Sequence, residues 1–167
     1  HRRRHSFPHD ALPILQILLD EGFKGNCYTA NQFAEAFEGK AGLGGERTIR
    51  EHLDAFLRDR PEGALHVFAY GSLMWNPALE YAEVQSCKVD GWRRSFCFWT
   101  PMGRGTPELP GLMLALADGG QCEGIAYRLA PDQLRSELAI LWNREMLVGV
   151  YRPQWVPATL RDGRTVT

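Results

Sequence analysis

The sequence predicts an α+β fold: a mixed, mainly antiparallel and barrel-like β-sheet with flanking helices, preceded by a short all-α segment. Two observations lead to this prediction. Residues 15–60 carry apolar side chains at helical spacing, whereas the segments after residue 61 are short and rich in β-forming residues. A single helix beginning at Pro131 is inserted late among those segments. Several strands with one late helix are typical of an α+β fold.

The chain divides into three stretches. Residues 1–14 are predicted to be non-native or disordered, because the string from His9 to Ile14 looks like a translated sequencing adapter. Residues 15–60 are predicted to be helical, and the stretch from Asp59 to Gly63 is a linker by its composition. The β-rich domain is therefore expected to occupy residues 61–167.

Within the helical stretch, residues 29–58 resemble a helix-turn-helix motif. Thr29 is a candidate N-cap for a short first helix, and the glycine-rich stretch at 39–45 ends it. A second helix follows these glycines, and its residues Arg47 and Arg50 could contact phosphates. That helix has a one-sided apolar stripe at positions i, i+4, i+7 and i+8, namely Ile49, Leu53, Phe56 and Leu57. We favour a packing helix pair over DNA binding, because the turn is unusually long, and nucleic acid is therefore not an expected partner.

Four strands are expected in the first part of the β-rich domain, at residues 65–70, 95–100, 112–117 and 124–129. The first two are dense in apolar or aromatic side chains, as in buried strands. The last two flank Asp118-Gly119-Gly120, and this arrangement predicts a β-hairpin.

A helix and an edge strand are expected near the C-terminus. Pro131 is suited to the first helical position, and the helix is predicted to run to about Met146. Residues 150–160 are expected to be extended. Pro153 and Pro157 cannot donate a hydrogen bond to a neighbouring strand, so this segment is predicted to lie at a sheet edge.

The composition excludes several classes of protein. The 167 residues are 44% hydrophobic and carry a net charge of −1, so no overall attraction to nucleic acid or to an acidic membrane is expected. No apolar run reaches the roughly 18 residues that a membrane span needs. The four cysteines are widely spaced without a C-x-x-C motif, which argues against a zinc site or a disulfide framework: Cys27, Cys87, Cys97 and Cys122. Unpaired thiols fit a reducing cytosol, so a cytoplasmic location is expected.

The β-rich domain lacks the residues of several common chemistries. All five histidines fall at or before His66, so the rest of the domain offers no imidazole for catalysis or for a metal. Neither a phosphate-binding G-x-x-x-x-G-K-[ST] loop nor a dinucleotide fingerprint is present. If the domain is an enzyme, its proton carrier is expected to be a carboxylate.

Glu145 is the carboxylate with a distinctive position. The helix that begins at Pro131 has a core-facing stripe of leucines, and at about 100° per residue Glu145 continues that stripe. Partial desolvation would raise its pKa and make it a better proton acceptor near neutral pH. Alternatively, the helix ends before this residue, or Glu145 pairs with Arg144 or Arg152 and only stabilises the fold. The pattern alone favours this second interpretation.

Two loops and an arginine pair are further candidates for ligand binding. The turn Tyr70-Gly71-Ser72-Leu73 follows the first strand, where backbone N–H groups could approach an oxyanion or a carboxylate. Arg93 and Arg94 could bind the carboxylates of a small acidic substrate or simply flank a strand. The loop that begins at Arg104 is similarly open to both interpretations.

Six sequence blocks in this order resemble the ChaC-type γ-glutamylcyclotransferases. Together they cover about residues 65 to 164, and the ensemble is much more specific than any one block. The blocks are Val67-Phe68-Ala69-Tyr70-Gly71-Ser72-Leu73-Met74-Trp75-Asn76-Pro77, Gly91-Trp92-Arg93-Arg94-Ser95-Phe96-Cys97, Arg104-Gly105-Thr106-Pro107-Glu108-Leu109-Pro110-Gly111, Gly124-Ile125-Ala126-Tyr127-Arg128-Leu129, Leu141-Trp142-Asn143-Arg144-Glu145-Met146 and Gly149-Val150-Tyr151-Arg152.

The resemblance implies a small barrel-like sheet flanked by helices. It further implies that glutathione is cleaved to 5-oxoproline and cysteinylglycine without a cofactor or a metal. It assigns the acid/base role to Glu145, which agrees with the helical-face argument. The loop that holds the γ-glutamyl group would be Tyr70, Gly71, Ser72 and Leu73. Arg93, Arg94 and Arg104 are weaker candidates for holding substrate carboxylates.

The resemblance leaves the completeness of the domain and its exact function open. Family members continue for several tens of residues past this C-terminus, so the domain is expected to be incomplete, and exposed sheet edges could leave the chain inactive. The substrate could be another γ-glutamyl amine or amino acid. The chain could instead be a non-enzymatic DNA-binding regulator with a small-ligand domain. It could also be a degenerate structural copy, against which the intact Tyr70–Leu73 turn and Glu145 argue.

Overall fold

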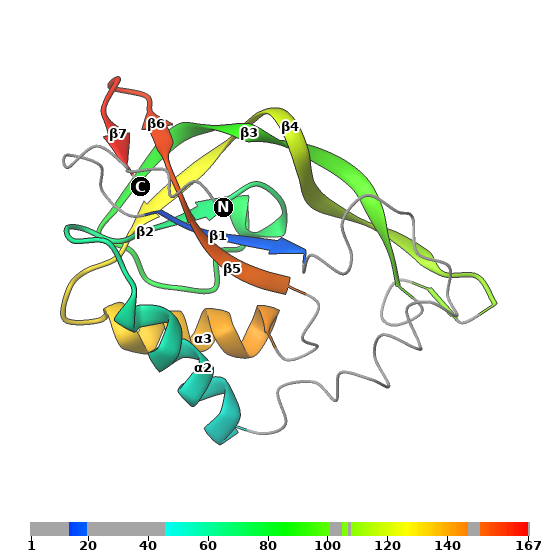
Figure 1. Cartoon of the computed structure of the whole chain (residues 1–167), viewed down its shortest axis with the longest axis horizontal. Coiled ribbons are helices and arrows are strands. Elements are labelled where there is room, and N and C mark those ends of the chain that lie inside the picture. Colours follow the sequence, from blue (N-terminus) through cyan, green and yellow to red (C-terminus); the bar gives the residue numbers. More distant parts are fainter. Residues whose placement is uncertain (1–13, 20–45, 101–104, 107, 147–150, 167) are drawn as a thin grey trace, which may run out of the picture.

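The computed structural model describes residues 14–19, 46–100, 105–106, 108–146 and 151–166 (Figure 1). Within these residues the chain forms one curled sheet, two α-helices and a short 3₁₀ turn. The helices are α2 (Glu46–Arg58) and α3 (Leu134–Glu145), and the turn is η2 (Ser72–Met74). The strands are β1 (Ile14–Leu19), β2 (His66–Ala69), β3 (Glu83–Thr100), β4 (Gly111–Arg128), β5 (Tyr151–Val156), β6 (Ala158–Leu160) and β7 (Thr165–Val166).

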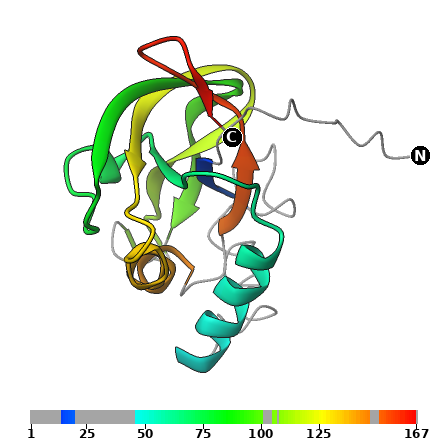
Figure 2. The same cartoon turned by 90° about the vertical axis from the view of Figure 1, so that its left-hand side faces the viewer.

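The order of the strands requires the sheet to curl. That order is β5-β1-β2-β4-β3-β6-β7, with β1 and β2 parallel and the remaining pairs antiparallel. β5 forms one edge and β6 pairs near the other, yet only Pro157 separates them in the sequence. The two edges must therefore come together, and Figures 1 and 2 show the resulting half-barrel. The predicted α+β class with a mixed, barrel-like sheet is confirmed, as is the edge position of the segment containing Pro153.

β2 is the central element of the core because both of its faces are buried. Alternate side chains of a strand point to opposite faces. Val67 and Ala69 accordingly pack in the cluster that contains the helices, whereas Phe68 packs in a second cluster with strands β3, β4, β6 and β7. A Cβ at Gly124 of β4 would lie 2.3 Å from the Ala69 carbonyl oxygen, so only glycine allows β4 this close to β2.

Strands β3 and β4 form one long bent ribbon. They pair over nearly their whole length of 18 residues each, with a shift of register between Asp90 and Trp92. Opposite that shift lie Gly119 and Gly120, whose φ angles of 86° and 82° suit a bulge. The predicted hairpin around these glycines is therefore wrong. The two glycines bend a strand that continues, because pairing with β3 holds the residues on both sides in one ladder.

Helices α2 and α3 cover one side of the sheet (Figure 1). The predicted apolar stripe of α2 faces the core: Ile49 is 3% exposed and Leu53 is 1% exposed, and Phe56 and Leu57 are half-buried against the same cluster. Both pack in the same cluster as Trp142 of α3. Across this contact the Trp142 indole Nε1 donates a hydrogen bond of 3.1 Å to His52 Nδ1. α2 is therefore part of the core of the β-rich domain, which agrees with a packing helix.

Three predicted elements differ from the structure or lie outside the described residues. Residues 14–19 form strand β1 and not a helix or a disordered end, because β1 pairs with β2 on one side and β5 on the other, and this pairing overrides the helical spacing. The predicted helix that Thr29 would cap lies outside the described residues, as do residues 1–13. The last helix begins at Leu134, three residues after Pro131, which lies in the preceding turn. Of the described helices, none combines the length and the apolar character that a membrane crossing requires.

The contact between His52 and Trp142 makes stability depend on pH. Burial lowers the pKa of His52 below its ordinary value of 6.5, and the neutral ring accepts the indole hydrogen bond. Because the unfolded chain then binds the proton more readily, the free energy of unfolding should fall as the pH drops below about 6.5.

Urea unfolding at pH 7.5 and 5.5 measures this effect by comparison with His52→Gln, which cannot be protonated. The wild type should lose more stability than the variant over this interval. At pH 7.5 the variant should cost about 1 kcal/mol at most, the contribution of one hydrogen bond. An identical pH dependence in the two proteins would contradict the prediction.

Candidate active site

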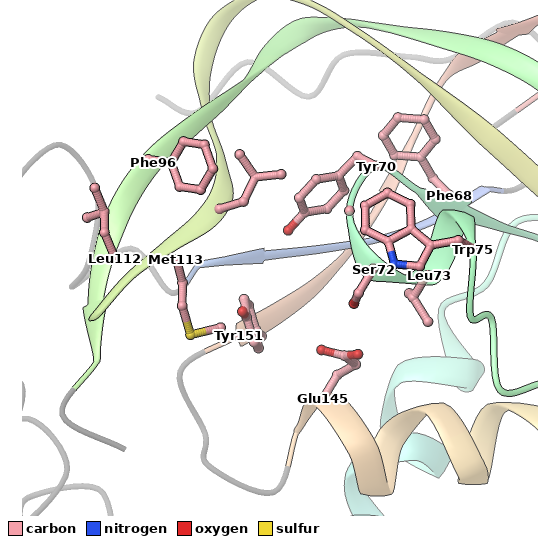
Figure 3. A pocket seen from close by; sticks show the side chains of 12 residues that line it. Phe68, Tyr70, Ser72, Leu73, Trp75, Phe96, Leu112, Met113, Glu145 and Tyr151 are labelled. Carbon is pink, nitrogen blue, oxygen red and sulfur yellow. The ribbon is translucent and has the colours of Figure 1, made fainter. Parts of the chain in front are cut away.

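A cavity of about 300 Å³ lies where the C-terminal end of α3 meets the loop after β2 (Figure 3). Four polar side chains line it: Tyr70, Ser72, Glu145 and Tyr151. The rest of its wall is apolar and comes from β2, η2 and the ribbon of β3 and β4. These residues are Phe68, Leu73, Trp75, Phe96, Leu112, Met113 and Leu114. A few polar groups in an apolar wall are typical of a small-molecule site.

Glu145 is the last residue of α3 and points into this cavity (Figure 3). The helical-face argument is confirmed, because Leu138 and Leu141 on the same face are buried and the Glu145 side chain is only 19% exposed. Burial raises the pKa of Glu145 above its ordinary value of 4.5, and the nearby Arg144 guanidinium partly opposes this rise. A carboxylate with a raised pKa is a better proton acceptor near neutral pH.

The Tyr70–Trp75 segment forms the wall that faces Glu145. The η2 turn is closed by a hydrogen bond of 2.9 Å from the Met74 N–H to the Gly71 carbonyl oxygen. From β4 the Tyr127 hydroxyl donates to the carbonyl oxygens of Leu73 and Met74, at 3.0 and 3.1 Å. An added Cβ at Gly71 would meet only Leu114 Cδ2 at 3.8 Å, so the space in front of this backbone is open. A ligand in the cavity can therefore approach the backbone of the turn.

Arg144 joins the turn to the helix end. Its Nε lies 3.2 Å from Glu145 Oε1. Its Nη1 donates to the Asn76 carbonyl oxygen at 3.0 Å, and its Nη2 donates to Ser72 Oγ at 3.2 Å. The expectation that Glu145 forms an ion pair with Arg144 is therefore correct, yet the carboxylate still faces the cavity. The sequence indicated Arg144 only as a pairing partner, because nothing in the pattern showed that it reaches the turn.

Two tyrosines complete the polar part of the cavity. Burial raises the pKa of Tyr151 to about 12, with a smaller contribution from the negative charge of Glu145. Burial likewise raises the pKa of Tyr70 well above its usual value. Both phenols therefore stay protonated at neutral pH and can donate hydrogen bonds. Tyr151 was not predicted as a site residue; its sequence signal is that it begins a strand six positions after Glu145.

Two of the three predicted arginines, Arg93 and Arg94, do not line the cavity. Arg93 is exposed and donates to the Asp118 carbonyl oxygen beside the bulge of β4. Arg94 is also exposed; it donates to the Glu123 carbonyl oxygen and approaches Met74 Sδ at 4.0 Å. Arg104 lies outside the described residues. The structure thus brings together Glu145 and the Tyr70–Leu73 turn, and it places Arg93 and Arg94 against the bend of the ribbon.

The ribbon supplies part of the cavity wall that the sequence did not predict. Phe96 of β3 and the consecutive residues Leu112, Met113 and Leu114 of β4 line the cavity. Trp75 also lines it and is 76% exposed, so an apolar rim surrounds the opening. The sequence predicts an apolar strand here, but which part of it lies over the cavity depends on the bend of the ribbon, which pairing with β3 determines.

The described residues thus form a small α+β half-barrel with a preformed cavity, in which the half-buried carboxylate of Glu145 faces a backbone turn. The chain belongs to the ChaC-like protein family, whose model matches residues 65–166. It is 52% identical over 115 residues to the glutathione-specific γ-glutamylcyclotransferase of Escherichia coli (strain K12), which covers 68% of this chain and 50% of that protein. It is 45% identical over 119 residues to the enzyme of the same description from Schizosaccharomyces pombe, covering 62% of this chain and 57% of that protein.

A solved structure supports the fold. The crystal structure of a selenomethionine-labelled γ-glutamyl cyclotransferase specific to glutathione from yeast matches with a TM-score of 0.52 and 21% identity. The match covers 60% of this chain and 55% of the yeast chain. The chain thus spans about half the length of these curated relatives.

Burial of Glu145 should lower the stability of the fold at neutral pH. Because its folded pKa is raised, the folded state holds the proton more tightly than the unfolded chain, and stability is lost as the pH rises from about 4.5 through the folded pKa. Glu145→Gln removes the ionisable group while keeping the shape. We expect its melting temperature to equal or exceed that of the wild type at pH 7.5, with a smaller difference at pH 5.

Glu83→Gln is a control of opposite sign. Hydrogen bonds from Gln85 and Arg128 hold the pKa of Glu83 below its ordinary value, and its carboxylate lies 2.9 Å from Arg128 Nε. This variant should melt at a lower temperature than the wild type at pH 7.5. A Glu145→Gln protein that is less stable than the wild type at pH 7.5 would show that the ion pair with Arg144 outweighs the cost of burial.

Proposed function

We propose that this domain is a γ-glutamylcyclotransferase that cleaves glutathione to 5-oxo-L-proline and L-cysteinylglycine. The observation that carries the proposal is the buried carboxylate of Glu145 facing the open backbone turn at Gly71 across an apolar cavity. The family membership and the glutathione-specific names of the relatives support the choice of reaction. Each reacting group of a γ-glutamyl substrate then has a counterpart in the cavity.

The reaction is an intramolecular aminolysis. Glu145 accepts a proton from the α-ammonium group of the γ-glutamyl residue, and the free amine attacks the γ-carbonyl carbon of the same residue. A new carbon–nitrogen bond closes the five-membered ring, and the original amide bond to the cysteinyl nitrogen breaks. Glu145 returns its proton to that nitrogen, and the ring nitrogen gives up its own second proton, which leaves the released amine in its ammonium form. The enzyme therefore ends as it began. The balance requires no oxidant, cofactor or added water.

The principal task of the site is to hold the folded conformer of the substrate. Ring closure within one molecule needs the amine and the carbonyl in contact, so the site contributes by holding the conformer in which they meet. The apolar wall and the Tyr70 and Tyr151 hydroxyls would fix the γ-glutamyl chain. Backbone N–H groups from Gly71 to Leu73 would stabilise the developing oxyanion.

The raised pKa of Glu145 suits this role. The carboxylate must accept a proton from an ammonium group and later release it to a departing amine. Burial brings its basicity closer to that of an amine than an exposed carboxylate would be, and Arg144 keeps the ionised form available near neutral pH. The proposed reaction needs both burial and the charge of Arg144. A Glu145 that was always protonated could not accept a proton, and a fully exposed Glu145 would be a weaker base.

The roles of Arg93, Arg94 and Arg104 as ligands of substrate carboxylates remain predictions. The contacts of Arg93 and Arg94 with backbone oxygens of β4 give them another function in the ribbon. A cytosolic location likewise remains a prediction, based on the cysteines; within the described part of the chain, Cys87, Cys97 and Cys122 form no disulfide.

A second candidate function is cyclisation of other γ-glutamyl amines or amino acids. Three of the polar residues that line the cavity, Tyr70, Glu145 and Tyr151, are half-buried. The γ-glutamyl group that they would hold is common to all such substrates. The rim at Trp75 and Phe96 is apolar and exposed, so it would contact the group attached to the γ-carbonyl. Glutathione remains the first choice because the relatives are named for it.

The assay is release of 5-oxoproline and cysteinylglycine from glutathione. It should be run on this chain and on a version extended at its C-terminus to the length of the relatives. Glu145→Gln should lower kcat by at least about a hundredfold, because general acid–base catalysis typically contributes that much. Glu123→Gln, an exposed carboxylate of β4, is the matched control and should retain activity.

The choice of substrate distinguishes the two candidate functions. Product from glutathione that disappears in Glu145→Gln supports the proposal, and product only from other γ-glutamyl amines supports the second candidate. No product from any γ-glutamyl compound with a folded, extended protein would overturn both.

A further inference from the structure

The guanidinium group of Arg144 uses all three of its nitrogens on different partners. Nε faces the Glu145 carboxylate at 3.2 Å, Nη1 donates to the Asn76 carbonyl oxygen at 3.0 Å, and Nη2 donates to Ser72 Oγ at 3.2 Å. Ser72 begins the η2 turn and Asn76 lies just beyond its end. One planar group therefore contacts both ends of the turn and the carboxylate at the end of α3.

The turn is held from a second side as well. The Tyr127 hydroxyl of β4 donates to the middle of the turn, at the Leu73 and Met74 carbonyl oxygens. Tyr127 ties the turn to the sheet, whereas Arg144 ties it to α3. Of these two residues, only Arg144 also contacts Glu145. It therefore links the position of the carboxylate to the position of the turn.

We propose that Arg144 is a positioning residue that fixes Glu145 relative to the Gly71–Trp75 turn through one rigid guanidinium group. The inference rests on the proposed function for its catalytic meaning, but the geometric link does not depend on the substrate. A planar fork can donate in several fixed directions at once, whereas a lysine ammonium is a single flexible point charge. Position matters here because a misplacement of about 1 Å can cost a hundredfold in rate.

Arg144 also sets the charge state of Glu145. Among the described residues, the titratable groups facing the carboxylate are Arg144 from its own helix, Tyr70 from the turn after β2 and Tyr151 from β5. The Cys97 thiol of β3 lies close enough to the two phenols to contribute to their raised pKa values. The phenols are neutral near pH 7, so among these groups Arg144 alone carries a positive charge that favours the ionised carboxylate.

Removal of that charge should raise the pKa of Glu145. The pKa is already raised by burial, and Arg144 is the described group that opposes the rise. In Arg144→Gln we expect the pKa of Glu145 to rise by about one further unit. Because the base must be ionised, the acid limb of the kcat/KM profile should move to higher pH by the same amount.

Arg144→Lys separates position from charge. Lysine retains a positive charge near Glu145, so the pKa of the carboxylate should stay within a few tenths of a unit of the wild-type value. A single ammonium group cannot hold Ser72 Oγ, the Asn76 oxygen and Glu145 together. We therefore expect kcat/KM at optimal pH to fall about tenfold or more, with faster hydrogen exchange at the Met74 amide.

Arg135→Gln is the matched control on the same helix. Arg135 pairs with Asp54 of α2, away from the cavity, and its side chain is 60% exposed. This variant should leave the pKa of Glu145, kcat/KM and the Met74 exchange rate unchanged. Circular dichroism and melting temperature establish that each variant is folded.

The direct measurement is carbon-13 NMR titration of the Glu145 carboxyl, identified by its absence in Glu145→Gln. An unchanged pKa in folded Arg144→Gln would overturn the electrostatic part of the inference. Wild-type kcat/KM and Met74 exchange in Arg144→Lys would overturn the positioning part. If the wild type turns over no γ-glutamyl compound, the proposed function fails, whereas the NMR titration and the exchange of the Met74 amide still decide the role of Arg144.

Discussion

The structure depends on one topological constraint: a single extended segment forms one edge of the sheet and then pairs again near the opposite edge. β5 pairs with β1, and after Pro157 the chain continues into β6, which pairs with β3. A flat sheet could not satisfy both pairings, so the sheet must curl. The curl brings Tyr151, at the start of β5, next to the turn after β2 and the end of α3. Proline at the junction is compatible with this geometry, because a residue between two pairings need not donate to either strand.

The end of α3 carries the largest electrostatic penalty of the site, the burial of the ionisable Glu145 side chain. The leucines that anchor the helix in the core also carry Glu145 into an apolar cavity, where ionisation is unfavourable. Arg144 offsets part of this cost, and its partial exposure of 30% leaves it partly solvated. The part of the desolvation penalty that Arg144 does not offset keeps the pKa of Glu145 raised. A carboxylate that was fully stabilised by its surroundings would be a poorer proton acceptor.

Local patterns predicted much of the fold and part of the site. The stripe of α2 and the strand at β2 follow from local patterns, because each is fixed by which side chains a single element must bury. Spacing also suggested an inward position for Glu145, but the pattern alone favoured a purely structural role for it. β1 and the long β4 could not be predicted in this way. Pairing with distant strands decides the structure of residues 14–19, and pairing with β3 turns the Gly119-Gly120 signal from a hairpin turn into a bulge. Arg144 was missed for the same reason, since its partners Ser72 and Asn76 lie 72 and 68 positions away.

The arrangement of the cavity explains why a few residues could be enough for the proposed chemistry. In an intramolecular ring closure the nucleophile and the electrophile arrive in one molecule, so the protein has only to select the folded conformer and assist proton transfer from the attacking nitrogen to the departing one. In the proposed reaction these two tasks would fall to the turn and to the carboxylate of Glu145. The side chain that connects the turn to the carboxylate then matters for the reaction as much as either of them. Arg144 is that side chain: it contacts the turn through two nitrogens and the carboxylate through the third. Geometry and charge at this site are therefore controlled by the same side chain.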